Sequence, residues 1–226
     1  MDTEQSWITS PWLVIDVETT GFGGESKIIE LAVVIMREGK LITHRRALFD
    51  PGTKINPYAS RVHGIWDNHV RGRPFITAKN AKTGRTPAEG IDALCAEHDV
   101  QAIVAYNGLT SDLPILRREL GDRWLELEAA IGLVIDPLRI VRGVVGKGKG
   151  EQTLFAVAAR FGLTAPEPGI EARDHSAPWD CVLTGRVLWH LREHLPLDVD
   201  EARALMTTKA RGRAAQEQLP DGEATP

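Results

Sequence analysis

Two carboxylates end the first apolar segment of this 226-residue chain. Asp16 and Glu18 flank Val17 in the stretch WLVIDVETTG, whose apolar run followed by a Thr-Thr-Gly turn predicts a buried strand. Residues i and i+2 of a strand point to the same face, so the two carboxylates should project side by side. A buried carboxylate pair is costly unless a cation lies between its members, and hard divalent ions prefer oxygen ligands. The pair therefore predicts a Mg²⁺ or Mn²⁺ site, with a solvated strand end as the alternative.

Two more acids and a histidine stand at the beginning of predicted helices. Asp112 begins the helix predicted for 112–120, and Asp180 lies near the beginning of the helix predicted for 177–195. Either acid could simply stabilise its helix dipole. His175 precedes the second helix in a loop-like stretch, five residues before Asp180. That position suits a base that must approach a water molecule beside a metal site.

The elements that must position these residues alternate along the chain. The second and third strands form an antiparallel hairpin, and Thr86 with Glu89 forms the capping box of the first helix. This order predicts a mixed sheet with helices packed on it. The predicted strands are 12–17, 28–36, 41–49, 102–106 and 133–135, and the predicted helices are 86–98, 112–120, 152–161 and 177–195.

Composition limits the classes of protein that remain. The chain is 42% hydrophobic and 26% charged with a net charge of -4, an ordinary globular mixture. Cys95 and Cys181 are too few for a disulfide framework, so we expect a reduced, cytoplasmic protein. The longest aliphatic run, 31–36, is far too short to span a membrane, and the first residues lack the apolar core of a signal peptide.

Three segments resemble the motifs of the DnaQ-like (DEDDh) 3′–5′ exonuclease family. VIDVETTGF resembles the first motif, AYNGLTSDLPIL the second, and HSAPWD the third, in the family's order. RVHGIWDNHV resembles its His-Gly-Ile segment, and VIDPLRIVR the strand and turn that carry Asp136. The similarity covers about residues 11–195. One departure is that Asn107 and Asp112 are five residues apart, where many members have four.

The resemblance implies an α/β fold, an RNase H-like mixed five-stranded sheet flanked by helices. It implies a metal-dependent enzyme that removes nucleoside 5′-monophosphates from the 3′ end of DNA, preferably single-stranded, with two Mg²⁺ or Mn²⁺ ions. His175 would be the general base. The implied metal ligands are Asp16, Glu18, Asp112 and Asp180, and the implied substrate contacts are Thr19, Thr20, Gly21, Phe22, His63 and Asn107.

Two other functions remain open at this point. One is an exoribonuclease that trims RNA 3′ ends, and the other is a polymerase-associated nucleic-acid-binding module with little activity. A polymerase partner fits either DNA reading, whereas a membrane partner is not expected. Residues 70–88 carry five positive charges and residues 137–150 carry four, both without acids, which suits phosphate contacts or a solvated basic loop.

The sequence also suggests a division of the chain. We expect a catalytic domain over 1–198, followed by a helix or disordered tail over 199–226, because the tail is poor in large apolar residues. The stretch GVVGKGKG at 143–150 is not expected to be a phosphate-binding loop, because glycine replaces the final Ser or Thr.

Overall fold

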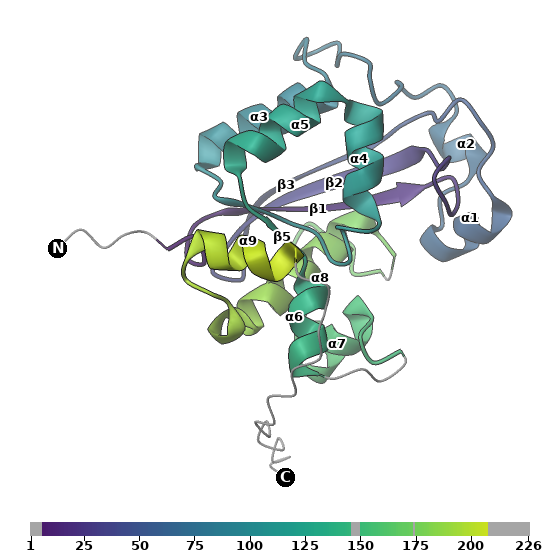
Figure 1. Cartoon of the computed structure of the whole chain (residues 1–226). Coiled ribbons are helices and arrows are strands. Elements are labelled where there is room, and N and C mark those ends of the chain that lie inside the picture. Colours follow the sequence, from purple (N-terminus) through teal and green to yellow (C-terminus); the bar gives the residue numbers. More distant parts are fainter. Residues whose placement is uncertain (1–5, 146–149, 174, 208–226) are drawn as a thin grey trace.

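A mixed five-stranded sheet forms the centre of the protein (Figure 1). The computed structural model describes residues 6–145, 150–173 and 175–207. The strand order is β3-β2-β1-β4-β5; β2 and β3 run antiparallel to their neighbours, and β1, β4 and β5 run parallel. The predicted fold class is therefore confirmed. The strands are β1 Trp12–Thr19, β2 Ile28–Arg37, β3 Lys40–Leu48, β4 Ala102–Val104 and β5 Val134–Ile135.

Helices cover both faces of this sheet. One face packs against α8 through Val14, Val34 and Met36, and the opposite face packs against α3, α4 and α5 through Leu13 and Ile15. Burial on both faces explains the nearly continuous apolar runs of β1 and β2. The helices are α1 Pro57–His63, α2 Asp67–Val70, α3 Pro87–His98, α4 Asp112–Leu120, α5 Asp122–Ile131, α6 Pro137–Val144, α7 Leu154–Arg160, α8 Ala177–His190, η1 Arg192–His194 and α9 Val199–Thr207.

Several helices were not predicted, and proline explains two of them. Pro57 and Pro137 suggest loops by composition, yet each occupies the first turn of a helix, where its missing N–H costs nothing. Asn56 and Asp136 cap these helices with their side chains. The last long helix is shorter than predicted: α8 ends at His190, and a separate 3₁₀ turn, η1, follows it.

The helix α5 was also missed, because Gly121 was interpreted only as the end of α4. Gly121 has a φ of 62°, so the chain reverses there and begins α5 at the next residue. The predicted capping box of α3, in contrast, is present: the Thr86 hydroxyl accepts from the Glu89 N–H, and the Glu89 carboxylate accepts from the Thr86 N–H.

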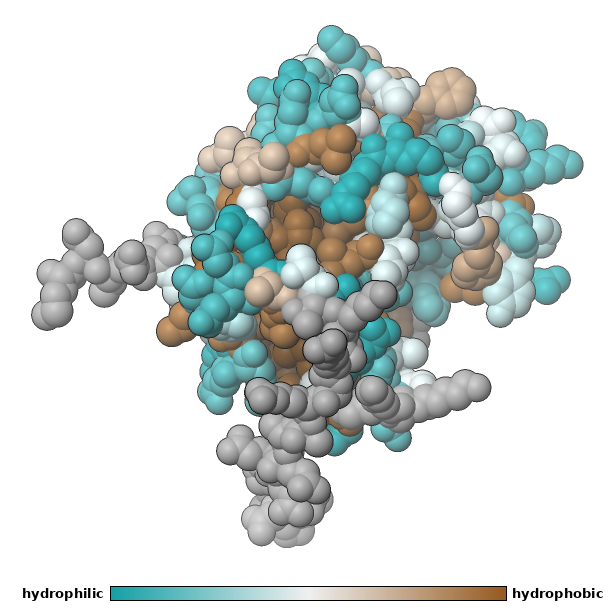
Figure 2. Space-filling model, in the orientation of Figure 1, coloured by the Kyte–Doolittle hydropathy of each residue, from teal (hydrophilic) through white to brown (hydrophobic). Residues whose placement is uncertain are grey.

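The helix α9 packs against β5, the outermost strand on that side. Ala202 and Met206 of α9 are buried, and the Asp136 N–H donates to the Met206 sulfur. Figure 2 shows a hydrophobic area between α5 and α9 on this side of the molecule. In the described part of the chain, no helix is both long and apolar enough to cross a bilayer, and both cysteines are buried free thiols.

Candidate active site

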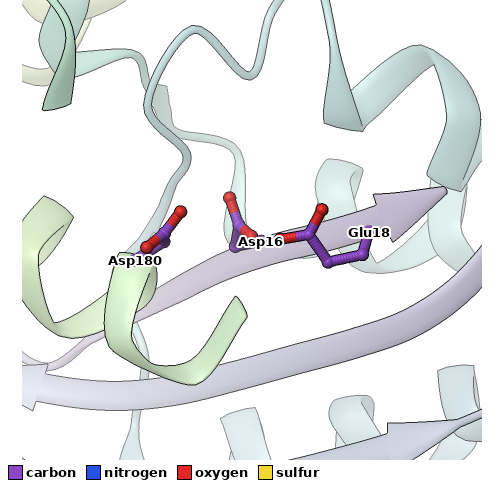
Figure 3. Close-up of side chains that lie close together, drawn as sticks. All are labelled: Asp16, Glu18 and Asp180. Carbon is purple, nitrogen blue, oxygen red and sulfur yellow. The ribbon is translucent and has the colours of Figure 1, made fainter. Parts of the chain in front are cut away.

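Three carboxylates from two elements converge beside the carboxyl end of β1. Asp16 and Glu18 project from the same face of β1, as their spacing predicts, and Asp180 comes from the first turn of α8. One oxygen of each carboxylate lies within 4.8 Å of the other two. Figure 3 shows Asp16 between Glu18 and Asp180. The structure thus brings together residues that are 164 positions apart in the sequence.

Burial and mutual repulsion make this cluster electrostatically costly. Burial, followed by the charges of Asp112, Asp180, Glu18 and Glu30, raises the pKa of Asp16 well above its ordinary value. Burial and the charge of Asp180 likewise raise the pKa of Glu18 to about 9. A site with several acidic oxygens and raised pKa values fits a hard divalent cation, which would offset the repulsion.

The fourth predicted acid, Asp112, lies next to the cluster but is engaged with the backbone. Asp112 is buried at the start of α4, and its Oδ1 accepts the Val17 N–H at 3.2 Å. The Ser111 hydroxyl donates to Oδ2. Burial raises the pKa of Asp112, while these hydrogen bonds lower it. Asp112 therefore adds negative charge beside Asp16 and ties α4 to β1.

Glu30, which was not singled out from the sequence, supports the same site. It is fully buried on β2, opposite Glu18, where the Arg46 guanidinium pairs with it. Its Oε2 also accepts the Ala177 N–H at 3.3 Å, so it holds the beginning of α8 against the sheet. The available signal was a lone acid within the aliphatic run IIELAVVIM.

A cavity of about 590 Å³ opens in front of the carboxylates. His175 lies at this cavity in an exposed position, with its ring 5.6 Å from that of Phe155 in an edge-on arrangement. Its φ of 57° is rare for a residue with a side chain, so the loop holds it in a strained conformation. The predicted site residues that line the cavity are Glu18, Thr19, Gly21, Phe22, His63, Asp112 and His175.

Two aromatic rings stand at the rim of this cavity. Phe22 is 78% exposed and Tyr58, on α1, is 62% exposed, and their ring centroids are 6.0 Å apart. Large aromatic side chains rarely remain so exposed without a ligand to contact. The tilted pair offers a surface on which planar groups could stack.

The loop that carries His175 is attached to α1 by Arg173, another residue that was missed. Its Nη1 donates to the His63 carbonyl at 3.0 Å and lies against Gly64, where an added Cβ would be 2.5 Å from that nitrogen. His63 itself is buried, and its Nδ1 accepts the Ile65 N–H at 3.1 Å. Burial lowers the pKa of His63.

Two predicted substrate contacts are used elsewhere. Thr20 is buried, and its hydroxyl accepts the Lys27 N–H at 3.0 Å, which closes the turn between β1 and β2. Asn107 has a φ of 57° in the turn before α4, and its N–H donates to Asp136 at 2.7 Å. Neither residue is among those that line the cavity in the described part of the chain.

Comparison with known proteins adds two kinds of finding. A family model described as RNase_T, exonuclease, matches residues 13–188. The DNA polymerase III PolC-type of Streptococcus agalactiae serotype III (strain NEM316) is 37% identical over 180 residues, which cover 79% of this chain. The match covers only 11% of that protein, so the chain spans about a tenth of the curated relatives it matches.

Solved structures share the fold at low sequence identity. Exonuclease X in complex with 5′ overhanging duplex DNA matches with a TM-score of 0.59 and 21% identity, covering 86% of this chain and 98% of that one. A 3′-exonuclease solved for 3′-end specific recognition of a histone mRNA stem-loop matches with a TM-score of 0.57 and 12% identity, covering 82% of each chain. These likenesses support the sheet and helix arrangement described above.

Proposed function

The chain belongs to the RNase_T exonuclease family, and we propose that it hydrolyses the 3′-terminal phosphodiester bond of single-stranded DNA ends, releasing nucleoside 5′-monophosphates. The observation that carries this proposal is the convergence of Asp16, Glu18 and Asp180 within 4.8 Å beside a cavity that His175 also lines. Buried acids in this number fit a metal-dependent hydrolase better than a binding module, because a module has no need of them.

We assign the metal site to the four acids. Asp16, Glu18, Asp112 and Asp180 would hold two divalent cations, Mg²⁺ or Mn²⁺. When bound, such ions stabilise negative charge on the attacking and leaving oxygens of a displacement at phosphorus. Asp112 contributes through its charge and also fixes α4 to β1 through the Val17 N–H.

His175 is the general base in this proposal. Its exposed side chain at the cavity can take a proton from the attacking water and return it to solvent. Phe155 packs against the ring edge-on and Arg173 fixes the loop beside it, so the imidazole is held near the carboxylates while keeping access to water.

The terminal nucleotide would occupy the cavity. Thr19, Gly21, Phe22 and His63 line it and are proposed to contact the sugar and base, with Phe22 stacking on an unpaired base. Thr20 and Asn107 are proposed to act indirectly, because their polar groups shape the turns that carry Gly21 and Asp112. An unpaired end suits this site because base stacking on an exposed ring requires a base that is free of its complement.

A degradation assay tests the proposed activity. Purified protein is incubated with 5′-labelled single-stranded DNA, duplex DNA or RNA of one sequence, in Mg²⁺, Mn²⁺ or EDTA. We expect a ladder of products shortened from the 3′ end, fastest on single-stranded DNA and absent in EDTA. A faster RNA reaction would make the protein an exoribonuclease, and no ladder under any metal would overturn the proposal.

The variant His175→Ala tests the assigned base. We expect the rate to fall by roughly 10²- to 10⁴-fold, the usual range for loss of a general base, while metal binding measured by calorimetry is retained. The matched control is His194→Ala, which removes an exposed histidine from η1, far along the chain from the site. Full activity of His175→Ala would show that another group takes the proton.

The relatives also suggest a setting for the activity. Because the matched curated proteins are named DNA polymerase III PolC-type, we propose that this chain works together with a polymerase, either as a partner or as part of a longer chain. Co-purification with a DNA polymerase would support this setting.

A further inference from the structure

A second cavity lies away from the catalytic one, between the sheet and the loop that joins α2 to α3 (Figure 1). Its volume is about 730 Å³. Among the described residues, it shares no lining residue with the catalytic cavity. Apolar side chains of β2, α3 and the end of β3 form its floor, namely Leu31, Val33, Phe49, Ile91 and Leu94.

Arginines surround this floor, and we call the cavity the basic groove. Arg45 comes from β3, and Arg73 and Arg85 come from the loop before α3. All three are exposed, and within the described ranges none of them forms an ion pair with an acid. The acid that lines the groove in the described structure is Glu97. The groove therefore carries an uncompensated positive charge.

The loop along the groove adds to this charge. Residues 70–88 contain three arginines and two lysines but no acid, although the whole chain has a net charge of -4. Guanidinium groups bind phosphate oxygens in a fixed, forked geometry, and an apolar floor can accept sugar and base faces. A polyanion with apolar faces thus complements the groove in both charge and polarity.

We propose that the basic groove binds the phosphodiester backbone of the nucleic-acid substrate, at nucleotides upstream of the 3′ end that enters the catalytic cavity. This inference rests on the proposed function, which supplies the polyanion. The segment 50–56 connects Phe49, in the groove, to α1, whose His63 lines the catalytic cavity. One strand can therefore contact both cavities by following this connection over the edge of the sheet.

The proposal predicts a dependence on substrate length. A strand too short to leave the catalytic cavity gains nothing from the groove, whereas a longer strand adds phosphate contacts there. Each lost contact to a single strand lowers the slope of log affinity against log salt by about 0.7. The double variant Arg73→Gln/Arg85→Gln should thus lower this slope by about 1.4 for long strands.

The test measures binding without cleavage and cleavage without the groove. Fluorescence anisotropy in EDTA gives the affinity and its salt slope for a labelled DNA strand of roughly twenty nucleotides, a length beyond typical single-strand sites. Cleavage of a trinucleotide gives the activity of the catalytic cavity alone. The variants are Arg73→Gln/Arg85→Gln and Arg45→Gln, and the control is Lys40→Gln/Arg160→Gln, which removes two exposed charges elsewhere.

We expect the groove variants to weaken long-strand binding about tenfold at low salt and to flatten its salt slope, with trinucleotide cleavage unchanged and the control like wild type. Wild-type affinity and slope in the groove variants would overturn the proposal and leave the groove to an acidic protein segment. Equal loss on the trinucleotide would also overturn it. Because the anisotropy arm needs no catalysis, an inactive wild type would contradict the proposed function and still decide whether the groove binds nucleic acid.

Discussion

At the scale of single residues, the site consists of acids that destabilise the fold on their own. Asp16 and Glu18 are held close to Asp180 and Glu30, and the pKa values of the first two are raised by burial and by these neighbours. Repulsion of this kind is usual where a charged ligand completes a site. The carboxylates are therefore selected for what they bind rather than for stability.

One prediction is that Glu18→Gln stabilises the metal-free protein. The pKa of Glu18 is about 9 in the folded state, against an ordinary value of 4.5. The folded state therefore binds the proton more tightly, and this contribution to stability is complete below about pH 4.5 and lost as the pH rises toward 9. In EDTA at pH 8, Glu18→Gln should raise the free energy of unfolding by about 1 kcal/mol or more.

Urea unfolding at pH 8 in EDTA measures this effect. Glu97→Gln, which removes an exposed acid from α3, serves as the control and should leave stability within about 0.5 kcal/mol of wild type. The same Glu18→Gln protein should show a smaller rise in melting temperature than wild type when Mg²⁺ is added. A Glu18→Gln protein that is less stable than wild type in EDTA would contradict the repulsion.

At the scale of elements, the position of α8 decides whether the site exists. Asp180 reaches Asp16 only because α8 packs closely on β1 and β2, with Glu30 holding its first residue. Close packing depends on Gly185, where an added Cβ would lie 2.1 Å from the sulfur of Met36. Met36 is fully buried, so its side chain has no free space into which it could move.

The second prediction follows from this contact. Gly185→Ala should destabilise the protein by about 1–3 kcal/mol through overpacking and should lower activity, because α8 would shift with Asp180. Gly143→Ala is the matched control: it lies in α6 with nothing within 4 Å of the added Cβ, so it should be neutral or slightly stabilising. Thermal unfolding and the cleavage rate test both variants, and an unchanged Gly185→Ala protein would refute the packing argument.

Local signals in the sequence predicted most elements but not their long-range partners. The Asp16–Glu18 spacing on a strand and the Thr86–Glu89 capping box are local, and both were predictable. The approach of Asp180 to Asp16 depends on tertiary packing, which the family resemblance implied and periodicity could not. Arg173 and Glu30 were missed because their partners lie far along the chain, at His63 and at Arg46 and Ala177.

At the scale of the whole molecule, the chain packs as one body through residue 207. The expected domain boundary at residue 198 falls between η1 and α9, yet α9 buries Ala202 and Met206 against β5. Arg203 also donates to the Gly132 carbonyl at 2.6 Å. These contacts tie the beginning of the expected tail to the edge of the sheet.

We therefore predict different results for two truncations. A chain that ends at 198 should unfold at a temperature several degrees lower than the full chain, because it loses two buried apolar side chains worth about 1–3 kcal/mol each. A chain that ends at 207 should keep the melting temperature and the trinucleotide cleavage rate of the full chain. Equal melting temperatures for the two truncated chains would assign α9 no part in the fold.

The late position of α8 in the sequence has a consequence during synthesis. The ribosome delivers β1, β2 and β3 first, and these strands can pair at once because they form a meander. Asp180 and the helix that carries it emerge only after most of the 226 residues have been translated. A nascent chain therefore lacks a complete acid cluster, so the messenger RNA from which it is read is not exposed to its hydrolytic site.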